Sequence, residues 1–140
     1  MSSGAASLIR PGVSMAVGLS ALAGHVLASG GLAGGAGVFA GTFALGAAVS
    51  VLNQIQERER DRRMERTRNR PLASGRMSPR QGGAVFIALL AASLASLWPG
   101  LSWGAPAVAL VVLGLYNGLY TALKPVTGWA MIPGAACGAL

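Results

Sequence analysis

The distribution of charge constrains this sequence more than any other feature. All 4 Asp and Glu residues and 9 of the 11 Lys and Arg residues lie between Glu57 and Arg80, and outside this block only Arg10 and Lys124 are charged. Hydrophobic residues make up 53% of the 140-residue chain and charged residues 11%, whereas soluble domains contain about 25% charged residues. This composition argues against a soluble globule, and it excludes a disordered chain, which needs low hydrophobicity and high charge. The sequence predicts an all-α polytopic membrane protein.

Four apolar segments are expected to cross a bilayer as helices, because a helix rises about 1.5 Å per residue and the hydrocarbon core is about 30 Å thick. We place these spans at residues 11–29, 32–52, 83–97 and 105–123, with the start of a fifth at 131–140. The charged block falls within one loop, residues 53–82. The expected architecture is a single, partial membrane domain over residues 1–140, a transmembrane helix bundle that stops within its fifth element.

The basic residues also predict the orientation of this bundle. If the four spans alternate in direction, Arg10, the charged block and Lys124 all fall on one side of the membrane. Cytoplasmic loops carry the excess of Lys and Arg, so we expect the N-terminus and the 53–82 loop to be cytoplasmic in a multi-pass protein of the cell (inner) membrane. The chain has one cysteine, Cys137, and therefore no disulfide within the chain.

The end of the second span carries oxygen ligands at helical spacing. Asn53, Glu57 and Asp61 stand four residues apart, so that on a helix they share one stripe along about 12 Å at the membrane surface. Carboxylate and amide oxygens are hard ligands, and Mg²⁺ typically binds one or two carboxylates together with substrate phosphates. The spacing therefore predicts a Mg²⁺ site formed by these three residues.

An arginine-rich stretch follows this stripe directly. Arg66, Arg68 and Arg70 alternate before Pro71 and Gly75, and guanidinium groups beside a metal site suit a diphosphate, which they bind through paired, charge-assisted hydrogen bonds. The competing interpretation is a basic loop that contacts anionic lipid and forms Glu–Arg pairs along the helix. Nucleic acid is not an expected partner, because residues 53–82 contain no aromatic side chain on which bases could stack.

The segment from 53 to 79 resembles the first signature motif of the UbiA superfamily of intramembrane prenyltransferases. Met64 and the run Leu119–Lys124 resemble most closely the branch of the family that farnesylates heme, although Ala122 stands where the family usually has proline and Pro125 where it has a second base. The residues that match the first motif are Asn53, Glu57, Asp61, Met64, Arg66, Thr67, Arg70, Pro71, Leu72, Gly75, Met77 and Ser78.

The resemblance implies a Mg²⁺-dependent enzyme that transfers a polyprenyl group, farnesyl above all, from its diphosphate to an aromatic or tetrapyrrole acceptor such as heme B, giving heme O. It implies that Asn53, Glu57 and Asp61 hold the metal, that Arg66, Arg68, Arg70 and Tyr120 bind the prenyl diphosphate, and that Arg66, Arg70 and Lys124 act in catalysis. For Tyr120 a place at the membrane interface, and for Lys124 an orienting positive charge, are equally compatible with the sequence.

Two alternatives remain open at this point. Another polyprenyltransferase of the same superfamily, acting on 4-hydroxybenzoate or on a quinone or chlorophyll precursor, carries much of the same motif. The resemblance further implies a bundle of nine spans with a second aspartate-rich cluster, which this sequence lacks, so that a second half or a partner chain is expected and activity of the chain alone is doubtful. The last alternative is a truncated, non-catalytic membrane protein surrounded by membrane lipids.

Overall fold

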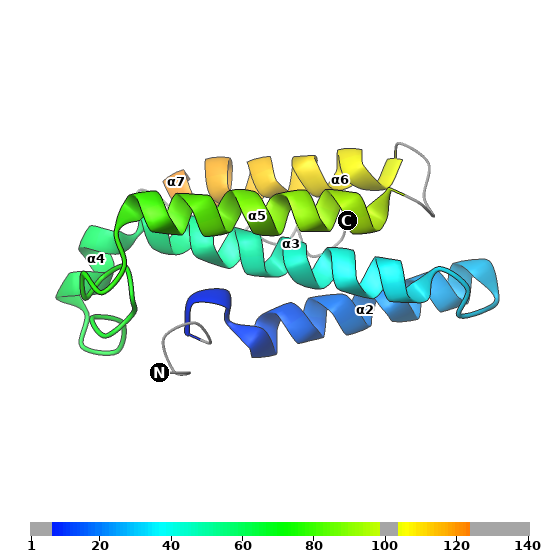
Figure 1. The fold of residues 1–140 in the computed structure, drawn as a ribbon, viewed down its shortest axis with the longest axis horizontal. Coiled ribbons are helices and arrows are strands. Elements are labelled where there is room, and N and C mark those ends of the chain that lie inside the picture. Colours follow the sequence, from blue (N-terminus) through cyan, green and yellow to red (C-terminus); the bar gives the residue numbers. More distant parts are fainter. Residues whose placement is uncertain (1–6, 99–103, 124–140) are drawn as a thin grey trace. The chain divides into compact units, whose positions relative to one another are not determined.

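The computed structural model describes residues 7–98 and 104–123, and the chain divides into two units, residues 1–100 and 101–140. The first unit contains α2 (Pro11–Ser29), α3 (Gly35–Gln56), α4 (Arg58–Arg63) and α5 (Pro79–Leu97), shown in Figure 1. The second contains α6 (Gly104–Leu113), a π-helix η1 (Gly114–Tyr120) and α7 (Thr121–Leu123). The described residues contain no strand, and α2, α3 and α5 are long and apolar enough to cross a membrane. The predicted class, an all-α membrane helix bundle, is confirmed.

Helix α3 is the centre of the first unit. It packs against α2 and against α5, and the chain reverses direction at each connection (Figure 1). Its buried face consists largely of small residues, among them Ala47 and Ala48, which are fully buried. Gly37 and Gly41 face α5 so closely that a Cβ atom would lie 3.0 Å from the Ser96 carbonyl oxygen and 3.2 Å from that of Ser93, respectively. Small residues four apart therefore let the two helix backbones approach.

The turn between α2 and α3 is made by glycines in the left-handed region. Gly30 and Gly34 have φ angles of 73° and 79°, which residues with a Cβ atom rarely adopt, and α3 consequently begins at Gly35 rather than at residue 32. The ring of His25 donates a hydrogen bond from Nε2 to the Ala33 carbonyl oxygen at 2.8 Å and closes this turn. The only histidine of the chain therefore has a structural contact far along α2 from the charged block.

The helices on either side of the polar loop are longer than their apolar segments. Helix α3 continues through the polar residues to Gln56, and α5 begins at Pro79, before the apolar run that starts at residue 83. Ser78 explains the early start, since its hydroxyl accepts from the Gln81 amide while the Gln81 side chain accepts from the Ser78 amide. This reciprocal capping box satisfies amides at the helix N-terminus.

The second unit is one helical segment with a widened turn in the middle. At the end of η1 the Thr121 amide and its Oγ1 both donate to the carbonyl oxygen of Tyr116, five residues back, the latter at 2.9 Å. No sequence pattern predicted this π-helix. Lys124, the side chain of Tyr120 and the expected fifth segment at 131–140 lie outside the described part of the chain.

Candidate active site

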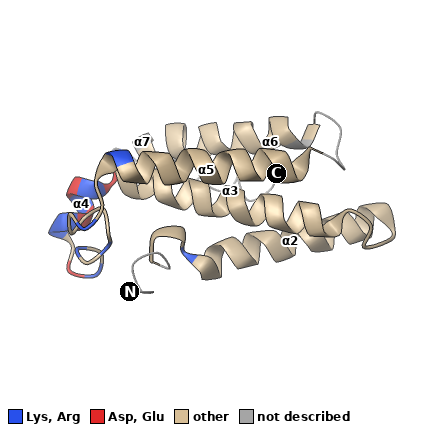
Figure 2. Cartoon of the chain, in the orientation of Figure 1, with Lys and Arg blue, Asp and Glu red and all other residues tan. Residues whose placement is uncertain are grey.

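Apart from Arg10 before α2, the charged residues of the first unit gather at one end, on and beside α4, on the following loop and at the start of α5 (Figure 2). The Glu57 amide donates to the Asn53 carbonyl oxygen at 2.9 Å, and the Asp61 amide donates to the Glu57 carbonyl oxygen at 2.8 Å. Helical hydrogen bonding thus continues across the boundary between α3 and α4. The Asn53 side chain donates from Nδ2 to Glu57 Oε2 at 3.0 Å, so the first two residues of the predicted stripe are in direct contact.

Asp61, the third residue of the stripe, is buried and connects α4 to the loop that follows, residues 64–77, which we call the motif loop. Its Oδ2 accepts a hydrogen bond from Arg70 Nη1 at 2.8 Å, in an ion pair whose side chains are 6% and 20% exposed, respectively. Its backbone carbonyl accepts from Oγ1 of the buried Thr67 at 3.1 Å. Asp61 therefore holds two residues of the motif loop through separate groups.

The motif loop is also held by apolar packing. Leu72 is 1% exposed and forms the core of this end of the bundle with Val51 of α3 and Leu8 of the N-terminal segment. A Cβ atom on Gly82 would lie 3.1 Å from Leu72 Cδ2, so α5 begins directly against the loop. Partly buried side chains complete this cluster: Ile55, Met77, Val85, Phe86 and Leu89. The loop is therefore a packed element of the first unit.

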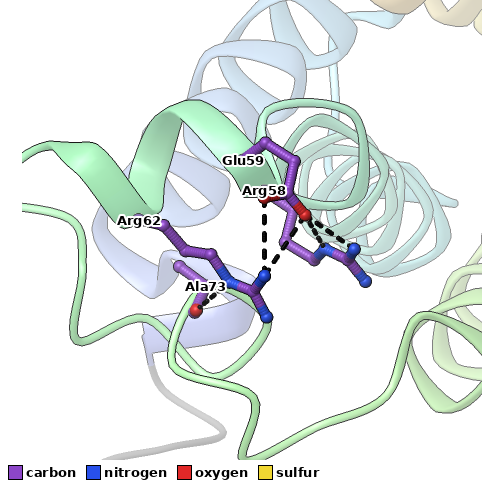
Figure 3. Close-up of polar contacts among 4 residues, drawn as sticks. All are labelled: Arg58, Glu59, Arg62 and Ala73. Atoms are coloured by element: carbon purple, nitrogen blue, oxygen red, sulfur yellow. Dashed lines mark hydrogen bonds and ion pairs between the residues drawn. The ribbon is translucent and has the colours of Figure 1, made fainter.

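Arg58 and Arg62 surround Glu59 on α4 (Figure 3). Arg58 Nη2 lies 2.7 Å and Arg62 Nη1 3.3 Å from Glu59 Oε1, and Arg62 Nε also donates to the Ala73 carbonyl oxygen at 2.8 Å. The hydrogen bond from Arg58, followed by the charge of Arg62, holds the pKa of Glu59 below its ordinary value. These are the Glu–Arg pairs expected if part of the basic block is structural, and Arg62 additionally fixes the motif loop.

The three alternating arginines have different surroundings. Arg70 turns inward to Asp61, and Arg68 lies on the surface, 3.8 Å from the exposed Glu65. Arg66 is exposed and makes no hydrogen bond or ion pair in the described part of the chain. The structure thus pairs the side chain of Asn53 with Glu57 and that of Asp61 with Arg70, while Arg66 and Arg68 are exposed.

Sequence reasoning missed Gln54 altogether. This side chain is 1% exposed, and its Nε2 donates to the carbonyl oxygens of Leu8 at 2.7 Å and Ser7 at 3.2 Å. It thereby fixes the N-terminal segment beside the motif loop. The sequence signal that could have identified Gln54 is its amide side chain on the apolar side of the polar stripe. A side chain at such a position is expected to be buried, and a buried amide needs hydrogen-bond partners.

The oxygen donors at this end fit a hydrated divalent cation. The described residues contain no group of three or more His, Cys, Asp and Glu side chains able to hold a metal, so a metal cage made of protein alone is not formed there. Two carboxylates and an amide are, however, hard donors in the number that Mg²⁺ uses when water and substrate phosphates supply the remaining positions. Arg70 already neutralises one of the two carboxylates.

The fold and site define a polytopic helical membrane protein with an acidic stripe and an arginine-rich loop packed together at one end of its bundle. The chain belongs to the UbiA prenyltransferase family, whose sequence profile matches residues 17–140. The resemblance found in the motif is thereby confirmed.

The curated relatives point to one branch of this family. The chain is 44% identical over 139 residues to protoheme IX farnesyltransferase of Oleidesulfovibrio alaskensis, covering 97% of this chain and 49% of the relative. It is 40% identical over 134 residues to the protein of the same name in Geobacter sulfurreducens, covering 95% and 49%, respectively. The chain thus spans about half the length of the curated relatives it matches. No solved structure matches it.

Proposed function

We propose that this chain carries the diphosphate-binding part of an intramembrane prenyltransferase that moves a farnesyl group from farnesyl diphosphate to heme B, giving heme O. The observation that carries the proposal is the continuous register of Asn53, Glu57 and Asp61 at a helix end, packed against an arginine-rich loop. The similarity to proteins named protoheme IX farnesyltransferase supports the choice of donor and acceptor.

Prenyltransferases of this family are generally dependent on a divalent metal, and here Mg²⁺ would be held by Asn53, Glu57 and Asp61. Held by these residues, the metal would supply Lewis-acid stabilisation of the negative charge on the departing diphosphate. The chain's own contribution is a row of positive charges beside the stripe. Arg66 and Arg68 are exposed. Arg66 would contact the diphosphate and neutralise it as the allylic carbon–oxygen bond breaks, an effect that is largest for donors fixed in advance, and Arg68 would add positive charge beside it.

Two further assignments rest on the resemblance. Tyr120 would line the prenyl diphosphate site, and Lys124 would donate to the departing diphosphate. The apolar prenyl chain would lie between helices, and membrane lipids would cover the outer faces of the spans. The remaining helices of the site would come from sequence equivalent to the other half of the relatives, whether in one chain with this one or in a partner chain.

Reconstitution of prenyl transfer tests this proposal. The chain is co-expressed with a segment equivalent to the unmatched half of the Oleidesulfovibrio relative, and membranes are supplied with farnesyl diphosphate, Mg²⁺ and heme B. We expect heme O, and we expect Asp61→Ala and Asn53→Ala to lower its formation at least about 10²–10³-fold, as for other preorganised electrostatic groups, with membrane insertion retained. Full activity of Asp61→Ala would overturn the metal assignment. Transfer to 4-hydroxybenzoate in place of heme would overturn the acceptor.

A further inference from the structure

The three alternating arginines of the motif loop are equivalent in the sequence but not in the structure. Arg70 has a partly buried side chain that donates to a carboxylate which is itself 6% exposed. Arg66 and Arg68 are exposed, and the one pair formed by Arg68 is long, at 3.8 Å, with both partners largely in solvent. Such exposed pairs contribute little to stability, so only Arg70 is committed to a partner within the protein.

The partner of Arg70 explains what this contact does. Asp61 is buried on α4, and a buried carboxylate deprived of its counter-charge is strongly unfavourable. The carbonyl of the same residue accepts from the Thr67 hydroxyl and, at 3.3 Å, from the Met64 amide. Asp61 is thus hydrogen-bonded to the start of the motif loop through its carbonyl group, and Arg70 ties a later point of the same loop to the Asp61 carboxylate.

Further hydrogen bonds that involve arginines hold the backbone of the loop after Thr67. The Ser74 amide and hydroxyl both donate to the Arg70 carbonyl oxygen at 2.8 Å. Arg62 fixes the Ala73 carbonyl from α4, and Arg76 donates to the Asn69 carbonyl oxygen. Arg62, Arg70 and Arg76 thus each hold part of the loop, whereas the exposed side chain of Arg66 makes no hydrogen bond or ion pair with any residue that the structure describes.

We propose that Arg70 is a positioning residue, which orients the Asp61 carboxylate and clamps the motif loop to α4, and that Arg66 is the arginine of this loop that contacts the diphosphate. The assignment of Arg66 rests on the proposed function, whereas the positioning role of Arg70 is a property of the protein without ligand. It follows that Arg70 acts on the diphosphate only through the place it gives to Asp61 and to the loop.

Hydrogen exchange of the motif loop in the purified chain tests the positioning role. In Arg70→Ala, peptides covering residues 64–77 should exchange about 10–100-fold faster, the range expected for loss of a hydrogen bond to a charged group. Arg70→Lys should restore much of the protection, because an ammonium group still supplies the counter-charge, and Thr67→Val should loosen the same peptides. Arg66→Ala, the matched control in the same loop, should leave exchange unchanged. Wild-type exchange in Arg70→Ala would overturn the positioning role.

Binding of inorganic pyrophosphate in the presence of Mg²⁺ tests the division of labour. We expect Arg66→Ala to weaken binding at least about tenfold, since one charge-assisted contact is lost, and Arg66→Lys to weaken it less. Arg70→Lys should bind nearly as the wild type does, because its loop remains in place. An equal loss of affinity in Arg70→Lys and Arg66→Ala would assign both arginines to the ligand and overturn the proposal for Arg66.

The two experiments separate this inference from the proposed function. If the wild-type chain does not bind pyrophosphate with Mg²⁺, the proposed function and the assignment of Arg66 fail together. The exchange experiment still decides the role of Arg70, because it requires neither ligand nor turnover.

Discussion

Leu72 is the apolar residue that anchors the motif loop, and its packing has a measurable consequence. The side chain is 1% exposed among Leu8, Val51 and the partly buried residues of α5. We expect Leu72→Ala to lower the free energy of unfolding by about 2–5 kcal/mol, as large-to-small substitutions in cores do, when unfolding is followed by denaturant titration in detergent. Met64, at the start of the same loop, is 54% exposed, and Met64→Ala should change stability by less than about 0.5 kcal/mol. Equal effects of the two substitutions would contradict the packing of the loop.

The titration of the Glu59 carboxylate should show the effect of Arg58 and Arg62 on its pKa. Its pKa lies below the ordinary value of 4.5, first because Arg58 donates a hydrogen bond to it and second because Arg62 lies nearby. A lowered pKa means that the pairs favour the folded state above pH 4.5 and that this contribution is lost as the pH falls through the lowered value. Carboxyl NMR of Arg58→Ala should show the pKa of Glu59 rising toward 4.5, with the Arg63→Ala spectrum as control. An unchanged titration in Arg58→Ala would show that this pair does not persist in solution.

At the scale of single residues, spacing predicted which residues share a helix face, but not which residue of the loop folds back to contact them. Asn53, Glu57 and Asp61 are related by helical hydrogen bonds, so their register follows from the sequence alone. The direction of Arg70 depends on the path of the loop after Thr67, which is set by contacts nine residues apart such as that with Asp61. Alternation of arginines in the sequence carries no information about that path.

At the scale of elements, Gly41 allows α3 and α5 to approach each other closely. A Cβ atom at this position would lie 2.6 Å from Leu97 Cγ and 3.2 Å from the Ser93 carbonyl oxygen, and overpacking of this kind typically costs about 1–3 kcal/mol. Gly41→Ala should therefore destabilise the bundle in a denaturant titration. Gly24 of α2 has no atom within 4 Å of the corresponding point, and Gly24→Ala should be neutral or stabilising by about 0.5–1 kcal/mol, because alanine favours the helix. A neutral Gly41→Ala would mean that the helices are free to move apart.

The elements themselves were predictable where composition alone determines them. Apolar runs and the glycine-rich turn indicated α2, α3 and α5, but their ends were set by local hydrogen bonds that hydropathy does not register. Ser78 and Gln81 start α5 ahead of its apolar run, and the polar residues after Leu52 continue α3 because the helix stays hydrogen-bonded to Glu57. The π-helix within Gly114–Tyr120 has no corresponding pattern in the sequence.

At the scale of the whole molecule, a hydrogen bond places the segment that carries Arg10 beside the end of α3 from which the charged block continues. Gln54, next to the acidic stripe, holds the carbonyl of Leu8, and Arg10 follows two residues later. The N-terminal segment and the charged block therefore occupy the same end of the first unit, which is the arrangement that alternating spans require. Helix α5 leaves this end at Pro79 and extends to Leu97, so its two ends should lie on opposite sides of a membrane.

Reporter fusions test this orientation. Because positively charged loops are retained in the cytoplasm, a fluorescent protein fused after Ser78 should fold and fluoresce, whereas alkaline phosphatase fused there should be inactive. Fused after Trp98, the C-cap of α5, alkaline phosphatase should be active, because Pro79–Leu97 contains enough apolar residues to cross the bilayer. The matched control replaces Arg60, Arg63 and Arg66 by glutamine, since these exposed side chains make no ion pair in the described part of the chain. Removing them lowers the charge bias without breaking a contact, and the phosphatase signal after Ser78 should rise. Active phosphatase after Ser78 in the unmodified chain would place the motif loop outside the cell and, with it, the proposed diphosphate site on the wrong side of the membrane for a cytoplasmic substrate.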